Sequence, residues 1–181
     1  MSDVTNQLIG LLRANGERWQ ALATGIDPAL LRRRPEPGEW SALECIGHAM
    51  DTEAGVFAKR VRAFLANADV LEAYEPDVEG TPITDDTDPA DLARRHARER
   101  ADTLALLATV SEPDLARTAR HLELGTVTLG EMLDEFAGHD LMHLVQAERA
   151  LMQAFIPGSG PWRPYFRAHD VEADGAAMRS A

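Results

Sequence analysis

The stretch LGEMLDEFAGHDLMHLVQAERALM, residues 129–152, decides the fold that we predict. Its apolar residues recur at three- and four-residue steps, the period of an amphipathic helix, and no proline interrupts them. Thr128 lies three residues before Glu131, a capping-box pattern that marks the start of the helix. His139 and His143 have helical i, i+4 spacing, so both imidazoles lie on one face with Cβ atoms roughly 5–6 Å apart. They are close enough to share one metal ion.

Three more segments show helical spacing of apolar residues, which gives the chain four long helices. These segments are residues 2–24, 41–66 and 89–109. The second begins with a capping box of its own, formed by Ser41 and Glu44. Because nothing in the sequence reads as a strand, we predict an all-α fold, a four-helix bundle.

Residues 67–87 separate the second and third helices and contain two prolines, one glycine and no sustained period. A connection this long is uncommon in a compact domain, and it usually crosses the fold or lines a site. We therefore predict a long crossover connection between helices two and three. Residues 111–127 are interrupted by a proline and a glycine, and we expect them to be irregular.

The chain of 181 residues is long enough to bury a core as one domain. We expect the bundle to occupy residues 1–155 and residues 156–181 to form a C-terminal extension that is partly disordered. The formal net charge of −12 argues against binding nucleic acid through phosphates. Residues 69–91 hold nine acidic residues and no basic one, and we interpret them as a solvated loop.

The sequence also predicts where the protein acts. No stretch approaches the roughly 20 apolar residues of a membrane span, so we expect no membrane partner. The N-terminus has neither the basic start nor the apolar run of a signal peptide. The single cysteine, Cys45, rules out an intramolecular disulfide and suits a reducing cytoplasm. We therefore expect a cytoplasmic protein.

A third histidine lies in the second long helix. His48 follows Ser41 by seven residues, and facing helices of a bundle could bring it to His139 and His143, where bundles build metal sites. Three neutral imidazoles are the ligand set of an open catalytic site that keeps water in the remaining position. Imidazole suits zinc, nickel, copper and iron, so the sequence does not choose the metal.

These residues resemble the two signature stretches of the DinB-like (damage-inducible) superfamily. WSALECIGHAMDTE, residues 40–53, has the tryptophan–serine start and then a histidine. GTVTLGEMLDEFAGHDLMHLVQAERAL, residues 125–151, has the G-x-x-T lead and then HDxxH. The resemblance covers roughly residues 8–152 and leaves out the acidic loop and the C-terminal extension.

The resemblance implies a four-helix bundle with one long crossover, a divalent transition metal (zinc, nickel or iron) on His48, His139 and His143, and frequent homodimers. Members with known activities use a low-molecular-weight thiol; they include bacillithiol S-transferases and a mycothiol-dependent maleylpyruvate isomerase. Many others are described only as metal-dependent hydrolases. The expected function is therefore metal-dependent thiol S-transfer to a small electrophile. A metal-dependent hydrolase and a non-catalytic binding module for a metal or small ligand remain open.

Three residues near the histidines have alternative interpretations. Asp140 stands where HExxH proteases carry a general-base glutamate, but aspartate is shorter and no helical third ligand follows. We expect it to hydrogen-bond a ligand histidine or a neighbouring helix. Glu44 is expected to cap the helix with Ser41 rather than face the metal. Cys45 could be a fourth ligand, although a buried apolar cysteine is commoner.

Other residues are interpreted mainly in structural terms. His96 lies among four arginines of the third helix, which predicts a solvated face that could hold a substrate carboxylate. Gly47 and Gly138 each precede a candidate ligand, and close helix packing there would justify their cost of about 1 kcal/mol. Three aromatic residues of the extension are expected to cover a bundle edge or a dimer partner, with a pocket wall as the alternative: Trp162, Tyr165 and Phe166.

Overall fold

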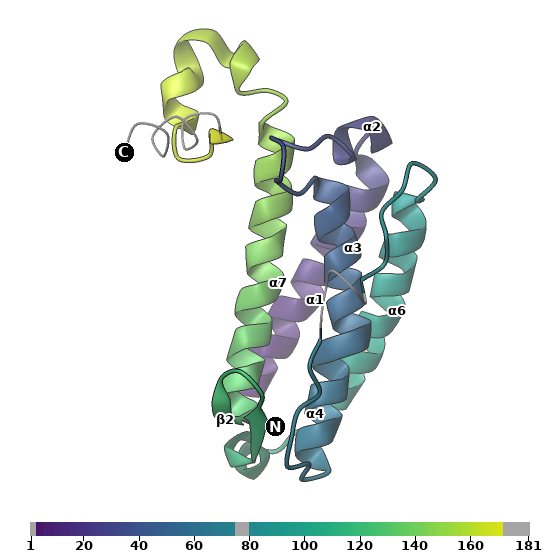
Figure 1. Ribbon diagram of the computed structural model, residues 1–181, viewed down its shortest axis with the longest axis vertical. Coiled ribbons are helices and arrows are strands. Elements are labelled where there is room, and N and C mark those ends of the chain that lie inside the picture. The colour runs from purple at the N-terminus through teal and green to yellow at the C-terminus, as the bar shows by residue number, and fades with distance from the viewer. Residues whose placement is uncertain (1–2, 75–79, 172–181) are drawn as a thin grey trace.

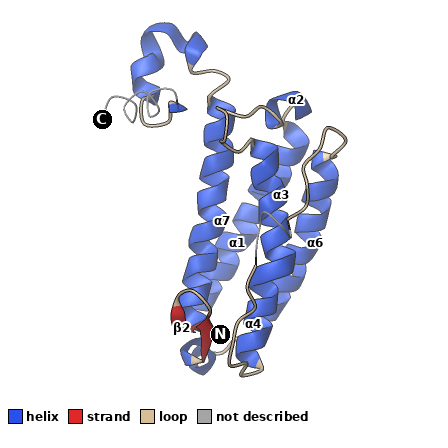
Figure 2. Ribbon diagram, viewed as in Figure 1, coloured by secondary structure: helices blue, strands red, loops and turns tan. Residues whose placement is uncertain are grey.

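The computed structural model describes residues 3–74 and 80–171. Figure 1 shows long helices packed side by side, with a two-stranded hairpin at one end of the bundle. Helix dominates the described chain, and strand is confined to that hairpin (Figure 2). The described elements are α1 (Asp3–Gly25), α2 (Pro28–Leu31), α3 (Ala42–Thr52), η1 (Glu53–Phe57), α4 (Ala58–Leu65), α6 (Pro89–Leu107), η2 (Glu112–Ala116), β1 (Thr118–His121), β2 (Gly125–Thr128), α7 (Leu129–Met152) and η3 (Pro157–Phe166).

The helices are arranged as a four-membered bundle in which α1 packs against α6 and α7, and α3 packs against the same two helices. In Figure 1, α3 begins at the end of the bundle where α1 finishes, and α6 begins at that same end. Neighbouring helices α3 and α6 therefore run parallel, which requires the connection between α4 and α6 to return along the whole bundle. The predicted all-α bundle with a long crossover is confirmed.

Local capping explains where the two helices that carry the candidate ligands begin. The Ser41 hydroxyl accepts a hydrogen bond from the Glu44 amide, and the Glu44 carboxylate accepts one from the Ser41 amide. Thr128 and Glu131 form the same reciprocal pair at the start of α7. Replacing such an N-cap residue by alanine typically costs about 1 kcal/mol. Both predicted capping boxes are confirmed.

The second long helix contains one turn of π-helix. The sequence predicted a single helix over residues 41–66; the structure has α3, η1 and α4 in succession, with η1 as the π segment. A π turn inserts one extra residue, is rare, and occurs frequently at functional sites. Here three side chains of the segment are buried: Glu53, Val56 and Phe57. The interruption thus places a carboxylate inside the bundle directly after the helix that carries His48.

The crossover is fastened to the bundle at several points. The amide of Leu71 donates to the carbonyl of Arg120, 3.0 Å away, and forms part of a parallel bridge onto β1. Further along, the amide and hydroxyl of Thr81 donate to the Asp51 carboxylate at 2.6 and 2.7 Å. The described part of the crossover therefore includes a segment that is hydrogen-bonded to α3, whereas the sequence predicted a solvated acidic loop. Residues 75–79 lie outside the described residues.

The hairpin corrects the expectation that residues 111–127 are irregular and that the fold has no strand. β1 pairs antiparallel with β2, with Thr118 opposite Thr128 and His121 opposite Gly125. Gly125 has φ of +82°, a left-handed conformation that glycine adopts without strain. Each four-residue strand has a single apolar side chain, Ala119 or Val127, so neither shows the repeated alternation of apolar and polar residues by which a strand is recognised in a sequence.

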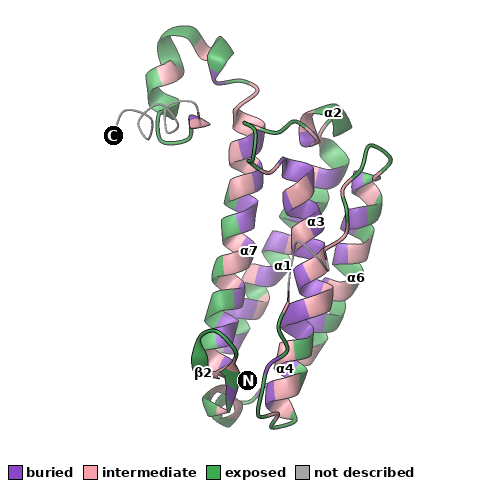
Figure 3. Ribbon diagram, in the orientation of Figure 1, coloured by how far each residue is buried: buried purple, intermediate pink, exposed green. Residues whose placement is uncertain are grey.

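The apolar core is divided into two clusters along the bundle (Figure 3 shows the buried faces). One contains Leu12, Phe57 and Phe136; the other contains Trp19 and Leu144. On each long helix the residues between the two clusters include buried polar side chains. These buried polar side chains lie at the same level of the bundle as His139 and His143 of α7.

The C-terminal extension continues beyond the end of α7 as η3 (Figure 1). Trp162 and Tyr165 are 64% and 82% exposed, and Phe166 is also exposed. The expectation that they cover a bundle edge was wrong, because the extension leads away from the helices; a dimer partner remains a prediction. Residues 172–181, predicted to be disordered, lie outside the described residues. Among the described helices, none combines the length and apolar character needed to cross a membrane.

Candidate metal centre

His48 from α3 and His139 and His143 from α7 converge inside the bundle. One ring nitrogen from each imidazole lies within 4.8 Å of those of the other two. The Nε2 atoms of His48 and His139 are 3.2 Å apart. Two nitrogens each about 2.05 Å from a tetrahedral ion are about 3.3 Å apart, so this spacing fits a shared ion. The structure brings together the three predicted ligands, and the set could hold a metal.

Neighbouring side chains fix the orientation of the rings. Trp40 stacks on His143 with centroids 5.7 Å apart and an interplanar angle of 18°, and its centroid is 5.0 Å from that of His48. The Nδ1 atom of His143 lies 2.8 Å from the amide oxygen of Gln146. Because that oxygen only accepts, Nδ1 donates and Nε2 keeps its lone pair for a metal. Phe57 contacts His139 edge-on at 5.3 Å.

Burial keeps the three imidazoles neutral. Burial, together with the nearby His143 and against an opposing effect of Asp51, lowers the pKa of His48 to about 4. Burial and, to a smaller extent, the other two rings lower the pKa of His139 to about 4 as well, against an opposing effect of Asp140. For His143, burial lowers the pKa against opposing effects of Gln146 and Asp140. At neutral pH, therefore, all three rings are unprotonated, the form that binds a metal.

A pocket of about 260 Å³ opens beside His48, between α3 and the crossover. Trp40, Glu44 and Asp51 line it from the helix side, and residues 80–83 form the opposite wall. Its volume suits a small molecule. The crossover, which the sequence predicted would cross the fold or line a site, does both.

Both carboxylates of the pocket are engaged. Glu44 accepts hydrogen bonds from the amide and hydroxyl of Ser41 at 2.8 Å and pairs with Arg34. Asp51 accepts two hydrogen bonds from Thr81. The prediction that Glu44 is a capping partner is therefore confirmed.

Cys45 is fully buried in the apolar cluster around Trp19 and does not join the histidine set. Burial and, to a smaller extent, the charge of Glu44 raise the pKa of its thiol to about 12. A thiol in this environment is not ionised at neutral pH, and ionisation is what metal binding requires. The commoner interpretation, a buried apolar cysteine, is confirmed.

Asp140 lies between the two histidines of α7 but points to other helices. Its carboxylate accepts hydrogen bonds from Asn15 Nδ2 at 2.8 Å and Trp19 Nε1 at 3.0 Å, and it pairs with Arg100 at 3.0 Å. Of the two roles predicted for it, the bond to a neighbouring helix is the one observed. Its position on the inward face of α7 follows from helical spacing.

The predicted solvated face around His96 was wrong. Arg94 and Arg98 are exposed, but His96 and Arg100 are 2% and 3% exposed. These two residues are one helical turn apart and share an inward face with Thr103. Glu53 and Asn15 are buried there too, which was not predicted from the sequence because their burial depends on contacts with distant helices. The i, i+4 spacing of His96 and Arg100 indicates that they share one face of the helix. The neighbouring arginines made that face look solvated.

The two glycines that precede candidate ligands differ. A Cβ atom on Gly47 would lie 2.7 Å from Ile83 Cδ1. The predicted close approach is present there, but its partner is the crossover rather than a helix. A Cβ atom on Gly138 would meet nothing within 4 Å. The packing explanation for Gly138 was therefore wrong, since its side of α7 is exposed.

Fold and site together define a class of protein. It is a four-helix bundle in which a long crossover joins two parallel helices, and its interior contains a three-histidine cluster that could hold a metal. A family model described as the DinB superfamily matches residues 11–147, and the chain belongs to that superfamily. The predicted resemblance is confirmed.

The bundle is also similar to a solved structure, YfiT from Bacillus subtilis. The TM-score is 0.72, the match covers 86% of this chain and 90% of that chain, and 17% of the residues are identical. YfiT is described as a probable metal-dependent hydrolase with an unusual four-helix bundle topology. At this level of identity the likeness shows the fold alone. No curated protein matches the chain.

Proposed function

We propose that this protein binds a divalent transition metal through His48, His139 and His143 and uses it in thiol S-transfer to a small electrophile. The convergence of three neutral imidazoles is the observation that carries the metal site. A coordinated ion would lower the pKa of a thiol or water bound in its remaining position. Zinc, nickel and iron all suit these ligands.

The state of the pocket carboxylates favours a thiol over water as the nucleophile. Glu44 and Asp51 are both occupied by hydrogen bonds from the chain, so neither is free to act as the general base that commonly assists water attack. A thiol is intrinsically more acidic and needs no such base. In the proposed reaction the thiol releases its proton to solvent water, sulfur bonds to the electrophile, and the bond between the electrophile and its leaving group breaks, so that the leaving group departs with the bonding electrons.

Residues of the pocket would hold the reactants. Trp40 offers an apolar ring face beside two of the imidazoles, and Ile83 with Pro82 provides an apolar wall. The crossover forms the wall of the pocket opposite His48, and electrostatic interactions are stronger beside a protein wall than in bulk water. The cytoplasmic location and the homodimer remain predictions.

The description of YfiT supports a second candidate, a metal-dependent hydrolase. In that case water would be the nucleophile, and an ester or amide the substrate. A binding module without catalysis would show metal or ligand retention with neither activity.

The metal site can be tested by replacing one ligand. His139→Ala should weaken zinc binding by about 100-fold or more, since total zinc affinities of about 10–16 kcal/mol are shared among a few ligands. His169→Ala is the matched control, because His169 is exposed and lies outside the cluster. Metal content and competitive chelator titration provide the measurement. Equal zinc affinity in wild type and His139→Ala would contradict the site.

The reaction class can be tested with the metal-loaded wild type. Conversion of 1-chloro-2,4-dinitrobenzene should require an added low-molecular-weight thiol and should disappear in His139→Ala. Hydrolysis of p-nitrophenyl acetate without thiol would instead support the hydrolase. Stoichiometric metal with neither reaction, across a panel of cellular thiols, would support the binding module.

A further inference from the structure

A group of six buried side chains, which we call the core ion cluster, lies where the two apolar clusters of the bundle meet; Trp19 belongs to one of those apolar clusters and joins the group through its indole N–H. Every long helix contributes to it, and each member is at most 3% exposed. The core ion cluster consists of Asn15 and Trp19 from α1, Glu53 from η1, His96 and Arg100 from α6, and Asp140 from α7.

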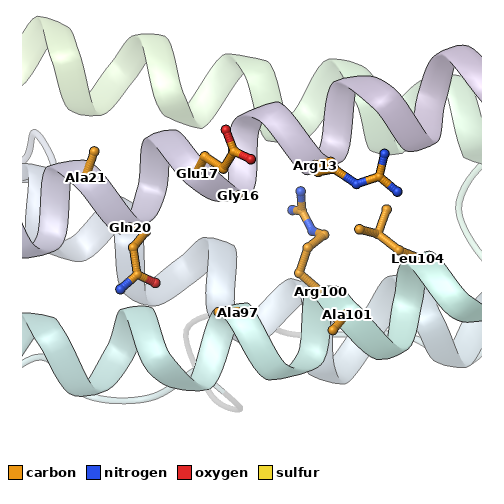
Figure 4. Close-up of a pocket in the computed structure, with 9 residues that line it drawn as sticks. All are labelled: Arg13, Gly16, Glu17, Gln20, Ala21, Ala97, Arg100, Ala101 and Leu104. Carbon is orange, nitrogen blue, oxygen red and sulfur yellow. The ribbon is translucent and has the colours of Figure 1, made fainter.

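Arg100 is the central member. Its stem lines a cavity of about 390 Å³ between α1 and α6, and Figure 4 shows its guanidinium directed from α6 toward α1 near Gly16. From there it reaches both ligand-bearing helices: Nη2 is 2.9 Å from Glu53 Oε2 and 3.0 Å from Asp140 Oδ1. It also donates to the backbone carbonyl of Leu12 at 2.6 Å. One side chain of a helix without ligands thus connects all three other helices.

Asp140 is the corresponding contact on α7. It receives hydrogen bonds from Asn15, Trp19 and Arg100, so its carboxylate is held from α1 and α6 together. The residue stands directly after His139 and three before His143. The hydrogen bonds to Asp140 therefore constrain the rotation of α7 at the level of His139 and His143.

Stability alone does not explain this arrangement. Burying charges is costly, and replacing a buried ion group by apolar side chains of similar volume is often neutral or stabilising. The core ion cluster also carries two carboxylates against one guanidinium, and Glu53 Oε1 has no hydrogen-bond partner. The best-documented role of buried ionic groups of this kind is to set the register of packed helices.

We propose that the core ion cluster, through Arg100 and Asp140, positions the histidines by fixing the rotation and separation of α3 and α7. Asp140 and Arg100 are positioning residues and do not themselves bind the ion. This inference rests on the proposed metal site.

The required precision can be estimated from helix geometry. An imidazole nitrogen about 7 Å from the axis of α7 moves by about 2.4 Å when the helix turns by about 20°. A metal–nitrogen bond is only about 2.0–2.1 Å long. Rotation of α7 would therefore separate the ligands, and apolar burial, which is non-directional, defines the rotation of a helix less sharply than hydrogen bonds do. Directional hydrogen bonds from two other helices oppose such rotation.

The test variant is Asp140→Asn, which keeps the size of the side chain and removes its charge. We expect at least a tenfold weaker zinc affinity and an altered visible spectrum of the cobalt-loaded protein, which reports ligand geometry. Glu148→Gln is the matched control: it lies on the same helix and pairs with Arg18, but both side chains are about 40% exposed (42% and 39%). Its zinc affinity and cobalt spectrum should equal those of the wild type.

Arg100→Lys provides a second variant if Asp140→Asn does not fold, because it keeps the charge and loses only the planar fork. It should shift the cobalt spectrum in the same direction. Wild-type zinc affinity and spectrum in a folded Asp140→Asn or Arg100→Lys protein would overturn the proposal.

The inference and the proposed function can fail separately. If the wild type binds no zinc or cobalt, the proposed function fails. The positioning role can then be tested in crystal structures of the metal-free wild type and variants. The Nε2 atoms of His48 and His139, 3.2 Å apart here, should separate beyond about 4 Å in Asp140→Asn or in Arg100→Lys, because the ligands sit on helices no longer held in place. An unchanged distance would overturn the inference.

Discussion

Gly47 gives a stability prediction that can be worked out from the structure. Replacing glycine by alanine inside a helix normally stabilises it by about 1 kcal/mol. At Gly47, however, the new Cβ would be 2.7 Å from Ile83 Cδ1, whereas carbon atoms prefer separations of about 3.5–4.0 Å. The end of the Ile83 side chain, which is half-buried against the apolar cluster around Trp19, must therefore move by about 1 Å.

We expect the displacement to cancel most of the gain, so Gly47→Ala should change the free energy of unfolding by less than about 0.5 kcal/mol. In an Ile83→Val background the clashing methyl is absent, and the same change should stabilise by about 1 kcal/mol. Urea unfolding of the four proteins in this double-mutant cycle measures the coupling between the two positions. Zinc affinity, measured alongside, should be unchanged.

Gly138→Ala is the matched control. It makes the same substitution one residue before a candidate ligand, but nothing lies within 4 Å of its added Cβ. It should therefore show the full gain of about 1 kcal/mol. The reasoning is refuted if Gly47→Ala stabilises the protein as much as Gly138→Ala does, and equally with and without Ile83→Val. In that case the contact between residue 47 and Ile83 does not constrain the crossover.

Two further predictions follow from the shifted pKa values. Burial lowers the pKa of His48 and His139 to about 4 and that of His96 to about 3, so between about pH 6.5 and 4 the unfolded chain binds protons that the native protein does not. The metal-free protein should therefore lose stability as the pH falls through this range, each histidine contributing a slope of up to about 1.4 kcal/mol per pH unit; a flat free energy of unfolding from pH 6.5 to 4.5 would contradict this. The thiol of Cys45, with its pKa raised to about 12 and no exposure, should resist a thiol-reactive dye at pH 8 in the native protein and react fully in denaturant; rapid native labelling would show that the site opens.

Much of the fold and the candidate site was predictable from local patterns. The capping boxes at Ser41 and Thr128 act within three residues, and the i, i+4 spacing of His139 and His143 is a property of one helix. Periodic apolar residues gave the long helices, and the length of residues 67–87 implied the crossover. The identity of His48 as the third member came from its place after a cap, supported by the family resemblance.

The features that the sequence analysis missed depend on contacts between distant segments. The hairpin exists because two four-residue strands pair with each other and β1 also pairs with the crossover. Arg100 appeared to be one of several surface arginines, since burial of a charge is stable only when partners from other helices surround it. Those partners, Glu53 and Asp140, come from separate elements.

The sequence by itself determined the helices, their starting points and the residue types that could bind a metal, because these follow from interactions within a few residues along the chain. Only the tertiary structure decided that the three imidazoles meet, that Ile83 fills the space left by Gly47, and that buried charges join the four helices at one level. Each of these requires atoms that are far apart in the chain to approach within a few ångströms, and packing of the whole bundle sets those distances.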